Sequence, residues 1–140
     1  MASVKRVLWV EPDRELQELL ASILEELSAE VTFASSLNEA LRLVEEAEVQ
    51  GRPFCLIVSE LKLPDGHGMD LLRTVGGINR RVKRVLCTGY PASPSWLEAT
   101  GSFLDGYWEK PVAVSRFMGE LEGLLQAADG EESAADSRRA

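Results

Sequence analysis

The stretch CLIVSELKLPDGHGMDLL, residues 55–72, holds the features around which the rest of the chain is arranged. It opens with an apolar run, residues 55–58, and a run this short between turn signals predicts a strand buried on both faces. Polarity returns at Glu60. Residues 63–68 then combine a proline, two glycines and Asp65, which predicts a turn in which Asp65 bonds its own backbone. Glu60 is therefore predicted to lie where a buried parallel strand enters a loop, the edge of an α/β sheet where ligands collect.

On both sides of this stretch, short apolar runs alternate with segments that carry apolar residues at helical spacing. A candidate cap at Asp13 and a capping box at residues 36–39 mark two helix starts. Gly76 and Gly77 are predicted to end the helix that begins near residue 69. The alternation predicts an α/β fold, in which helices cover both faces of a parallel sheet through right-handed crossovers. The predicted strands are residues 6–10, 30–34, 55–58 and 82–88, with a fifth within residues 101–109 that is centred on 105–108.

Length and composition predict one domain of ordinary size. The chain has 140 residues, of which 45% are apolar and 27% charged, and these values are typical of a water-soluble globular protein. No apolar run approaches the roughly 20 residues that a membrane span needs, and no signal peptide is readable, so a cytoplasmic protein is expected. Residues 1–126 form the predicted domain. The polar residues 127–140 lack apolar periodicity and are predicted to be a disordered tail or a linker.

Charge and residue usage argue against two classes of function. The net charge of −8 opposes nucleic-acid binding by this domain. The one histidine, His67, and two cysteines, Cys55 and Cys87, lack the spacing of a zinc site. Both cysteines fall in predicted strands, as do Trp9 and Trp108, and all four are expected in the core.

Polar and charged residues follow the ends of four predicted strands. They are Glu11, Glu60, Thr88 and Lys110, and Lys110 is followed by Pro111. Because the carboxyl ends of parallel strands meet at one edge of the sheet, we expect these four side chains to lie together.

This constellation resembles the receiver domain of two-component response regulators. The family has the pattern D-x-x-[LM]-P-x-x-x-G where residues 60–68 read ELKLPDGHG, and Thr88 and the Lys110-Pro111 pair also match. The resemblance covers residues 5–126. It implies a flavodoxin-like (βα)5 doubly wound sheet of strand order 2-1-3-4-5. It further implies an aspartate that accepts phosphate from a histidine kinase beside Mg²⁺, and it makes Pro111 a candidate for a cis peptide bond.

Two residues depart from the family pattern. Glu60 stands where the phosphoacceptor aspartate belongs, and Pro12 replaces one of the two acids that follow the first strand, which leaves Glu11. The adjacent Asp13 is expected to serve the helix cap. The extra methylene of Glu60 moves its carboxylate about 1.5 Å toward Lys110, into the space of the phosphoryl group. We therefore expect no phosphorylation of the usual kind, no catalytic residue and no resident metal. Glu11 and Glu60 are the residual metal candidates, with Mg²⁺ bound weakly at best.

Three roles of Glu60 stay open from the sequence. The carboxylate can pair with the Lys110 ammonium and fill the former site. It can act as a built-in mimic of the phosphorylated state, which would be partial because a glutamate carries one negative charge and an acyl phosphate nearly two. A slow acceptor role for Glu60 or Ser59 is the third. Lys62, two residues past Glu60, is expected to add a second cation near this pocket.

The resemblance also implies a partner-binding face, formed by the fourth helix, the fifth strand and the fifth helix. Tyr107 stands at the place of the family's switch aromatic, Tyr90 at the pocket rim, and Trp96 on the weakly specified fourth helix. Aromatic side chains exposed on such a face would suit an interaction hot spot, although they are also suited to core packing.

The sequence thus favours an atypical receiver domain that acts as a protein-interaction or dimerisation module and is not an enzyme. Its expected partners are a histidine kinase or a downstream signalling protein, and a homodimer stays open. The alternative is a genuine phosphoacceptor that uses Mg²⁺ and an unorthodox acceptor residue. A flavin electron carrier with a related sheet is disfavoured, because no Ser-, Thr- and Gly-rich phosphate loop follows the first strand.

Overall fold

A computed structural model describes the backbone of residues 4–90, 93–100, 103–111 and 114–139. At residues 94, 100, 114 and 115, and beyond residue 128, the backbone alone is described. The strands are β1 (Arg6–Val10), β2 (Glu30–Ala34), β3 (Leu56–Ser59), β4 (Lys62–Leu63), β5 (Gly66–His67), β6 (Lys83–Thr88) and β7 (Gly106–Glu109). The helices are α1 (Arg14–Leu24), α2 (Leu37–Val49), α3 (Gly68–Ile78), α4 (Pro94–Thr100) and α5 (Val114–Arg139).

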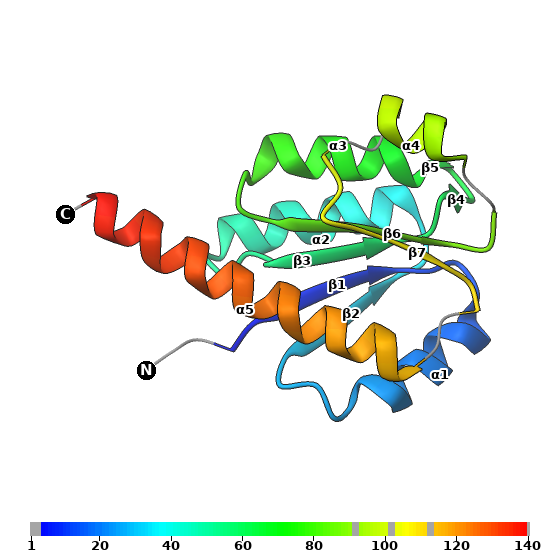
Figure 1. Cartoon of the computed structure of the whole chain (residues 1–140), viewed down its shortest axis with the longest axis horizontal. Coiled ribbons are helices and arrows are strands. Elements are labelled where there is room, and N and C mark those ends of the chain that lie inside the picture. Colours follow the sequence, from blue (N-terminus) through cyan, green and yellow to red (C-terminus); the bar gives the residue numbers. More distant parts are fainter. Residues whose placement is uncertain (1–3, 91–92, 101–102, 112–113, 140) are drawn as a thin grey trace.

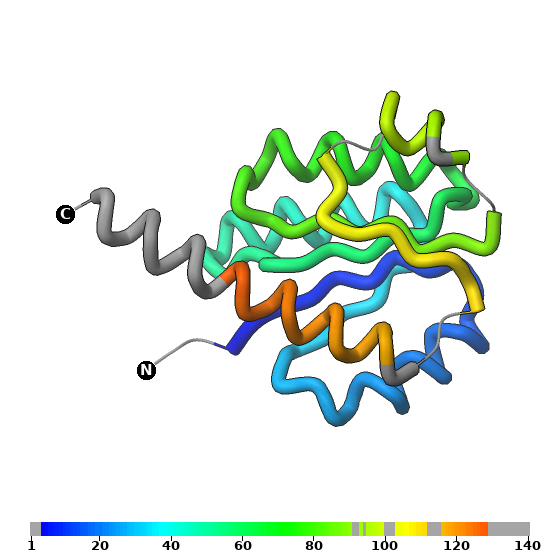
Figure 2. Tube along the Cα trace, viewed as in Figure 1, coloured from blue at the N-terminus to red at the C-terminus, as the bar shows by residue number. Residues whose placement is uncertain are grey.

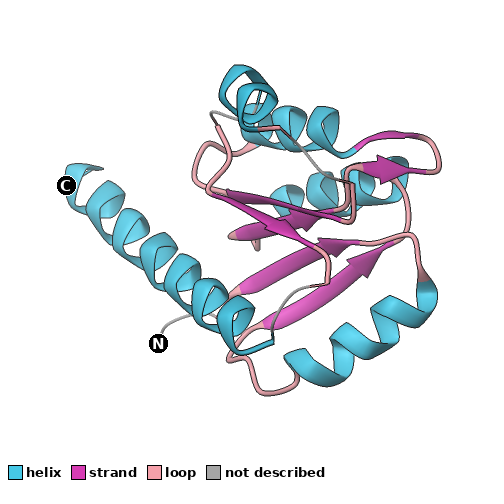
Figure 3. Cartoon of the chain, turned by 45° about the vertical axis from the view of Figure 1, so that its right-hand side comes forward, coloured by secondary structure: helices cyan, strands magenta, loops and turns pink. Residues whose placement is uncertain are grey.

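Five strands form a parallel sheet in the order β2-β1-β3-β6-β7. Because β4 and β5 pair with each other as a separate small hairpin, this is the order 2-1-3-4-5 of the main strands. The predicted doubly wound α/β fold is confirmed, with α2 and α3 on one face and α1 and α5 on the other (Figures 1 and 3). The loops that follow the main strands gather at one edge of the sheet (Figure 2).

The two faces of the sheet follow from the alternation of side chains along each strand. In β1, Leu8 and Val10 join the core with α2 and α3, whereas Val7 and Trp9 join the core with α1 and α5. Trp9 and Trp108 are buried, as predicted, with 2% and 6% exposure. Both rings pack edge-on against Phe117 of α5, with centroids 5.5 and 5.6 Å away. Aromatic packing of this geometry fixes α5 against the sheet.

Two predicted helix caps are present. The Asp13 carboxylate accepts hydrogen bonds from the backbone N–H groups of Glu15 and Leu16, 3.0 and 3.3 Å away. The Ser36 hydroxyl accepts one from Glu39 N–H at 3.2 Å. Each cap satisfies backbone donors that the first helical turn leaves unpaired.

The expected end of α3 at Gly76 and Gly77 is wrong, because both glycines lie inside the helix, which continues to Ile78. Contact with the next strand explains the first glycine. The Arg84 guanidinium crosses α3 so closely that a Cβ on Gly76 would lie 2.1 Å from its nitrogen. The missing side chain thus leaves room for the Arg84 guanidinium against α3, and the pattern alone mistook this glycine for a stop signal.

Helix α5 runs to Arg139, past the boundary at residue 126, and Ala128 is still 8% exposed. The division into a domain and a tail or linker stays a prediction. No helix within the described ranges is both long and apolar enough to span a membrane. Cys87 is buried as expected, whereas Cys55 is half-buried.

Candidate functional site at the carboxyl edge of the sheet

The four polar residues predicted to meet at the carboxyl edge do lie together. The Lys110 ammonium donates to Glu11 Oε1 at 2.5 Å and to Glu60 Oε1 at 2.9 Å. Glu11 and Glu60 are only 2% and 8% exposed, and the lysine side chain is 23% exposed. Because Glu11 directly follows β1 and Glu60 directly follows the adjacent β3, the sheet register itself brings the two carboxylates to either side of the ammonium.

Glu60 is surrounded by donors. Its Oε2 accepts the N–H of Leu61 at 2.5 Å, and the hydroxyl of Thr88 also hydrogen-bonds the carboxylate. Burial alone would raise the pKa of Glu60. The hydrogen bonds from Thr88, Lys110 and Leu61 outweigh it, and the pKa lies below its ordinary value. Glu60 is thus ionised at neutral pH.

Lys110 is the complementary half of this pair. Burial alone would lower its pKa, but hydrogen bonds and charge attraction from Glu11 and Glu60 raise it instead. The lysine therefore stays protonated throughout the neutral range. Beneath the pair lies Cys87, whose thiol pKa burial raises to about 12, against a lowering by the Lys110 charge and a further rise from the two glutamates. Such a thiol is protonated and unreactive at neutral pH.

The residues that follow β1 are committed to structure. Glu11 Oε2 accepts the N–H of Asp13 at 3.0 Å, and Gln17 Nε2 donates to the Glu11 carbonyl at 2.5 Å. The Asp13 carboxylate caps α1, as expected, and Pro12 has no carboxylate to add.

These residues do not fit Mg²⁺. An ammonium already lies between the two buried carboxylates, Glu11 and Glu60, at hydrogen-bond distance from each. Among the residues that the structure describes, no group of three or more acidic, histidine or cysteine side chains is placed to hold a metal ion. Mg²⁺ needs an octahedral oxygen shell, whereas Pro12 supplies no carboxylate and the two carboxylates present are paired with Lys110.

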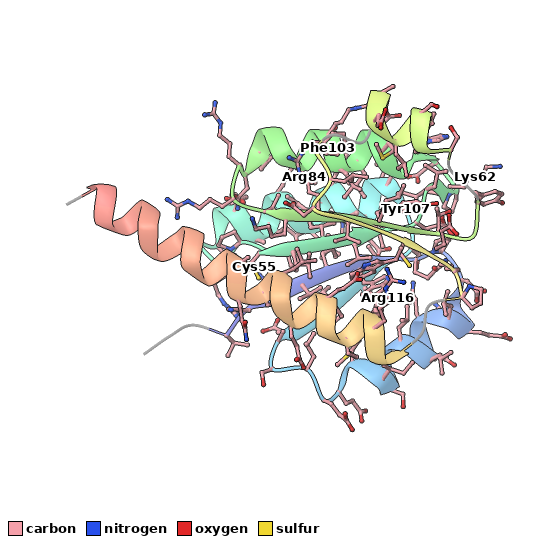
Figure 4. All side chains as sticks on the ribbon, in the orientation of Figure 1. Cys55, Lys62, Arg84, Phe103, Tyr107 and Arg116 are labelled. Atoms are coloured by element: carbon pink, nitrogen blue, oxygen red, sulfur yellow. The ribbon has the colours of Figure 1, made fainter. Side chains whose placement is uncertain are left out.

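Lys62 and Tyr90 lie at the rim of the pocket. The Lys62 ammonium lies 4.0 Å from the centroid of the Tyr90 ring, a cation–π contact between two exposed side chains. The predicted second cation is thus at this edge, facing an aromatic ring (Figure 4). Tyr90 N–H donates in turn to Thr88 Oγ1 at 3.1 Å, which ties the rim to the residue that contacts Glu60.

The remaining predicted positions are also placed. Tyr107 and Trp96 are half-buried and pack against the core on the α2 and α3 face, and the Tyr107 hydroxyl donates to Glu109 at 3.3 Å. Tyr90 is the most exposed of the three aromatics, at 47%. The peptide bond between Lys110 and Pro111 is cis.

Asp65 is a site residue whose role the sequence did not reveal. Its carboxylate accepts the N–H groups of Leu37 and Asn38 at 2.7 and 3.0 Å, so it caps α2 from a distant loop. Hydrogen bonds from Asn38 and Leu37 hold the pKa of Asp65 below its ordinary value. The turn predicted here is part of a two-stranded hairpin, β4 and β5, which the sequence did not reveal. The hydrogen bonds of Asp65 hold this hairpin against the start of α2.

Gly68 was likewise missed. A Cβ added there would lie 2.0 Å from the carbonyl oxygen of Glu60, and Gly68 N–H donates to the Leu61 carbonyl at 2.7 Å. The loop therefore folds back onto the backbone of Glu60 and fixes its position. The family pattern contains this glycine, but the reason for it appears only in the structure.

The fold and the edge define a class of protein: a doubly wound signalling domain with an acid after β3, a hydroxyl after β6 and a Lys-Pro pair after β7. More narrowly, the chain belongs to the response regulator receiver domain family, whose sequence model matches residues 7–122.

Relatives of known name support this assignment. The response regulator receiver protein CpdR of Brucella abortus (strain 2308) is 27% identical over 126 residues, which cover 89% of this chain and 100% of CpdR. The methanogenesis regulatory protein FilR1 of Methanothrix harundinacea (strain 6Ac) is 33% identical over 126 residues, which cover 88% of this chain and 24% of FilR1. The response regulator PilR of Pseudomonas aeruginosa is also similar, and the match covers 30% of its length. The chain thus spans a third or less of FilR1 and PilR.

Solved structures agree on the fold. The CheY-like receiver domain protein from Methanospirillum hungatei JF-1 has a TM-score of 0.78 at 27% identity, covering 92% of this chain and 99% of that one. A receiver domain protein from Clostridium thermocellum has a TM-score of 0.78 at 21% identity, covering 90% and 98%, which supports the fold alone.

Proposed function

We propose that this chain is a receiver domain that works without the usual phosphorylation cycle and acts in the cytoplasm as a protein-interaction or dimerisation module of two-component signalling. The observation that carries the proposal is the buried Glu60 carboxylate at the acceptor position, where it accepts a hydrogen bond from the Lys110 ammonium at 2.9 Å. In a phosphoacceptor of this class, a divalent cation is needed to offset the charge on the acids and on the transferring group. Here Pro12 supplies no second carboxylate after β1, and the Lys110 ammonium pairs with the two acids that are present.

The donors around Glu60 point the same way. Leu61 N–H, the Thr88 hydroxyl and the Lys110 ammonium are the groups that could stabilise the oxygens of a phosphoryl group at this edge. All three hydrogen-bond the Glu60 carboxylate instead. An incoming phosphoryl group would have to break these contacts and would find no Mg²⁺ site. We therefore propose that the domain is not an enzyme.

Between the two main roles open to Glu60, one contact favours a built-in mimic. The carboxylate engages the Thr88 hydroxyl, and Thr88 Oγ1 holds Tyr90 N–H at 3.1 Å. The Thr88 hydroxyl thus connects the Glu60 carboxylate to the backbone of Tyr90, in the segment before α4. With a single negative charge the mimicry should be partial.

The test is phosphoryl transfer itself. The protein is incubated with acetyl phosphate and Mg²⁺, and its intact mass is measured at intervals. We expect no phosphoprotein. A double variant, Glu60→Asp with Pro12→Asp, restores the acid pair and the shorter acceptor, and serves as the positive control that should gain one phosphoryl group.

A phosphoprotein formed by the unaltered chain would overturn the proposal and favour the alternative, a working acceptor that uses Glu60 or Ser59. Tryptophan fluorescence gives an independent reading, because Trp9 and Trp108 lie two residues from Glu11 and Lys110. The unaltered chain should not respond to Mg²⁺, whereas the double variant should respond with saturation.

The proposed partners are a histidine kinase or a downstream signalling protein, with self-association as the simplest form of interaction. Sedimentation of the unaltered chain over a range of concentrations tests a homodimer. If the mimic interpretation holds, Glu60→Gln should shift the result toward the monomer, since it removes the charge that orders Thr88 and Tyr90.

A further inference from the structure

A cleft of about 360 Å³ opens at the amino edge of the sheet, the edge opposite the ion pair. It lies between the loop that enters β3, the loop that enters β6, and α5. The half-buried Cys55, labelled in Figure 4, lies in its wall. Phe54 and Ala128 form an apolar floor, and Ile78, 39% exposed, is an apolar residue at the opening.

The arginines at this edge of the sheet differ in whether they have an acidic partner. Arg6 and Arg52 both pair with Glu30, with nitrogen to oxygen distances of 3.5 and 3.2 Å. Arg80 and Arg81 line the cleft, and within the described part of the chain neither guanidinium has an ion-pair or hydrogen-bond partner. The two adjacent arginines give this edge a local positive charge in a chain of net charge −8.

The loop that carries these arginines is held in place. Asn79 Oδ1 accepts the Arg81 N–H at 2.9 Å, and Asn79 Nδ2 donates to Glu48 Oε1 at 3.0 Å. The Asn79 N–H also donates to the Val75 carbonyl at the end of α3. Among the described residues of the cleft wall, the carboxylate is that of Glu48, which the Asn79 amide engages, and the loop backbone is fixed before any partner arrives.

We propose that this cleft binds an acidic peptide segment of a partner protein, with one aliphatic side chain on the floor and flanking carboxylates on Arg80 and Arg81. Arginine forks match carboxylates in a bidentate geometry, and arginine clusters recognise acidic motifs in this way. The volume lies at the low end of the range for ligand sites, so it fits a side chain or two rather than a whole helix.

The probe is a capped pentapeptide, Glu-Glu-Leu-Glu-Glu, titrated into the full chain labelled with ¹⁵N, with chemical shifts as the readout. Saturable shifts are expected at the amides of Cys55, Ile78 and Arg81. The peptide Glu-Glu-Ser-Glu-Glu should bind several-fold more weakly, because it lacks the apolar side chain.

Charge reversal with a matched control makes the test specific. Arg80→Glu with Arg81→Glu should weaken binding about tenfold or more. Arg14→Glu with Arg42→Glu makes the same change of net charge on exposed residues of α1 and α2, and should leave affinity within about twofold. If reversal alters the spectrum of the free protein, Arg80→Gln with Arg81→Gln replaces it.

Three outcomes would overturn the proposal: no saturable binding of the leucine peptide, equal losses in the two double variants, or equal affinity for the serine peptide. The inference is separable from the proposed function, because the cleft and the ion pair lie at opposite edges. The variant Glu60→Asp with Pro12→Asp should bind the peptide as the unaltered chain does, whether or not it accepts phosphate.

Discussion

At the carboxyl edge of the sheet, the Lys110 ammonium contacts two carboxylates that solvent barely reaches, and every charged group of the cluster has a partner from another element. At the amino edge, Arg80 and Arg81 face a cleft, and the described residues offer their guanidinium groups no partner. We call the carboxyl edge closed, because its charged groups pair with one another, and the amino edge open, because Arg80 and Arg81 have no such partner among the described residues. The difference teaches where to look for binding in this receiver domain: away from the place where the family carries its chemistry.

Helix α3 connects the two edges and shows the same contrast in its glycines. At its first residue, Gly68, the space for a side chain is taken by the Glu60 carbonyl oxygen. Near its last turn, Gly77 has nothing within 4 Å of the position a Cβ would take. The closed edge is therefore closely packed in its backbone as well as in its charges.

The largest expected effect comes from removing the shared cation. Lys110→Met leaves two buried carboxylates without their partner, and we expect a loss of about 3 kcal/mol in the free energy of unfolding. Since a divalent cation can then replace the ammonium, Mg²⁺ should recover part of the loss by binding the folded state. Urea unfolding with and without Mg²⁺ measures both effects.

Lys62→Met is the matched control, because Lys62 is a lysine at the same edge whose ammonium faces a tyrosine ring in solvent. Its loss should stay below about 1 kcal/mol. Equal losses in the two variants would contradict the description of the carboxyl edge as closed and interdependent.

The second effect concerns the backbone at the two ends of α3. Gly68→Ala places a methyl group 2.0 Å from the Glu60 carbonyl oxygen, and displacing that loop should cost about 2 kcal/mol. Gly77→Ala lies in open space within the same helix and should gain about 0.5–1 kcal/mol from helix propensity. Thermal unfolding of both variants gives the comparison, and a stabilising Gly68→Ala would show that the loop is free to move.

The third effect is the pH dependence of stability. The folded-state pKa of Glu60 is lowered, so its contribution is complete above its ordinary pKa of about 4.3 and is lost as the pH falls through the folded value. The pKa of Lys110 is raised, so its contribution is complete below about 10.4 and is lost as the pH rises through the folded value.

The contribution of this ion pair to stability should therefore be level between these limits and fall at both ends. In Glu60→Gln the free energy of unfolding should fall less steeply as the pH decreases at the acid end. Urea unfolding at a series of pH values measures this acid limb of the stability curve. Asp65→Asn serves as a comparison, because that carboxylate also has a lowered pKa but is exposed, so its contribution to the acid limb should be smaller. An unchanged acid limb in Glu60→Gln would contradict the assignment.

Much of this edge could be predicted because it is encoded locally. The apolar runs and the polar residue after each run fixed which side chains meet, and parallel pairing then required Glu11, Glu60, Thr88 and Lys110 to converge. The cap at Asp13 is local as well, because its carboxylate bonds backbone N–H groups two and three residues further along, so it too was predictable.

What escaped prediction depends on partners distant in sequence. Asp65 caps α2 across 28 residues, and the Arg84 guanidinium packs against Gly76, and neither relation has a local signature. The cleft at the amino edge was invisible for the same reason. The sequence shows a basic cluster around Arg80, but only the fold shows which of its members have partners.

The smallest expected effect lies at the open edge and completes the comparison. Arg80→Ala removes a charge that has no ion-pair or hydrogen-bond partner among the described residues, so the free energy of unfolding should change by less than about 0.5 kcal/mol, the usual range for surface substitutions. The same change should weaken binding of the Glu-Glu-Leu-Glu-Glu peptide. Urea unfolding and the peptide titration, made on one preparation, separate the two quantities. A loss of stability comparable to that of Lys110→Met would mean that Arg80 supports the fold. The arginine would then have a partner within the protein, which would contradict the contrast between the two edges.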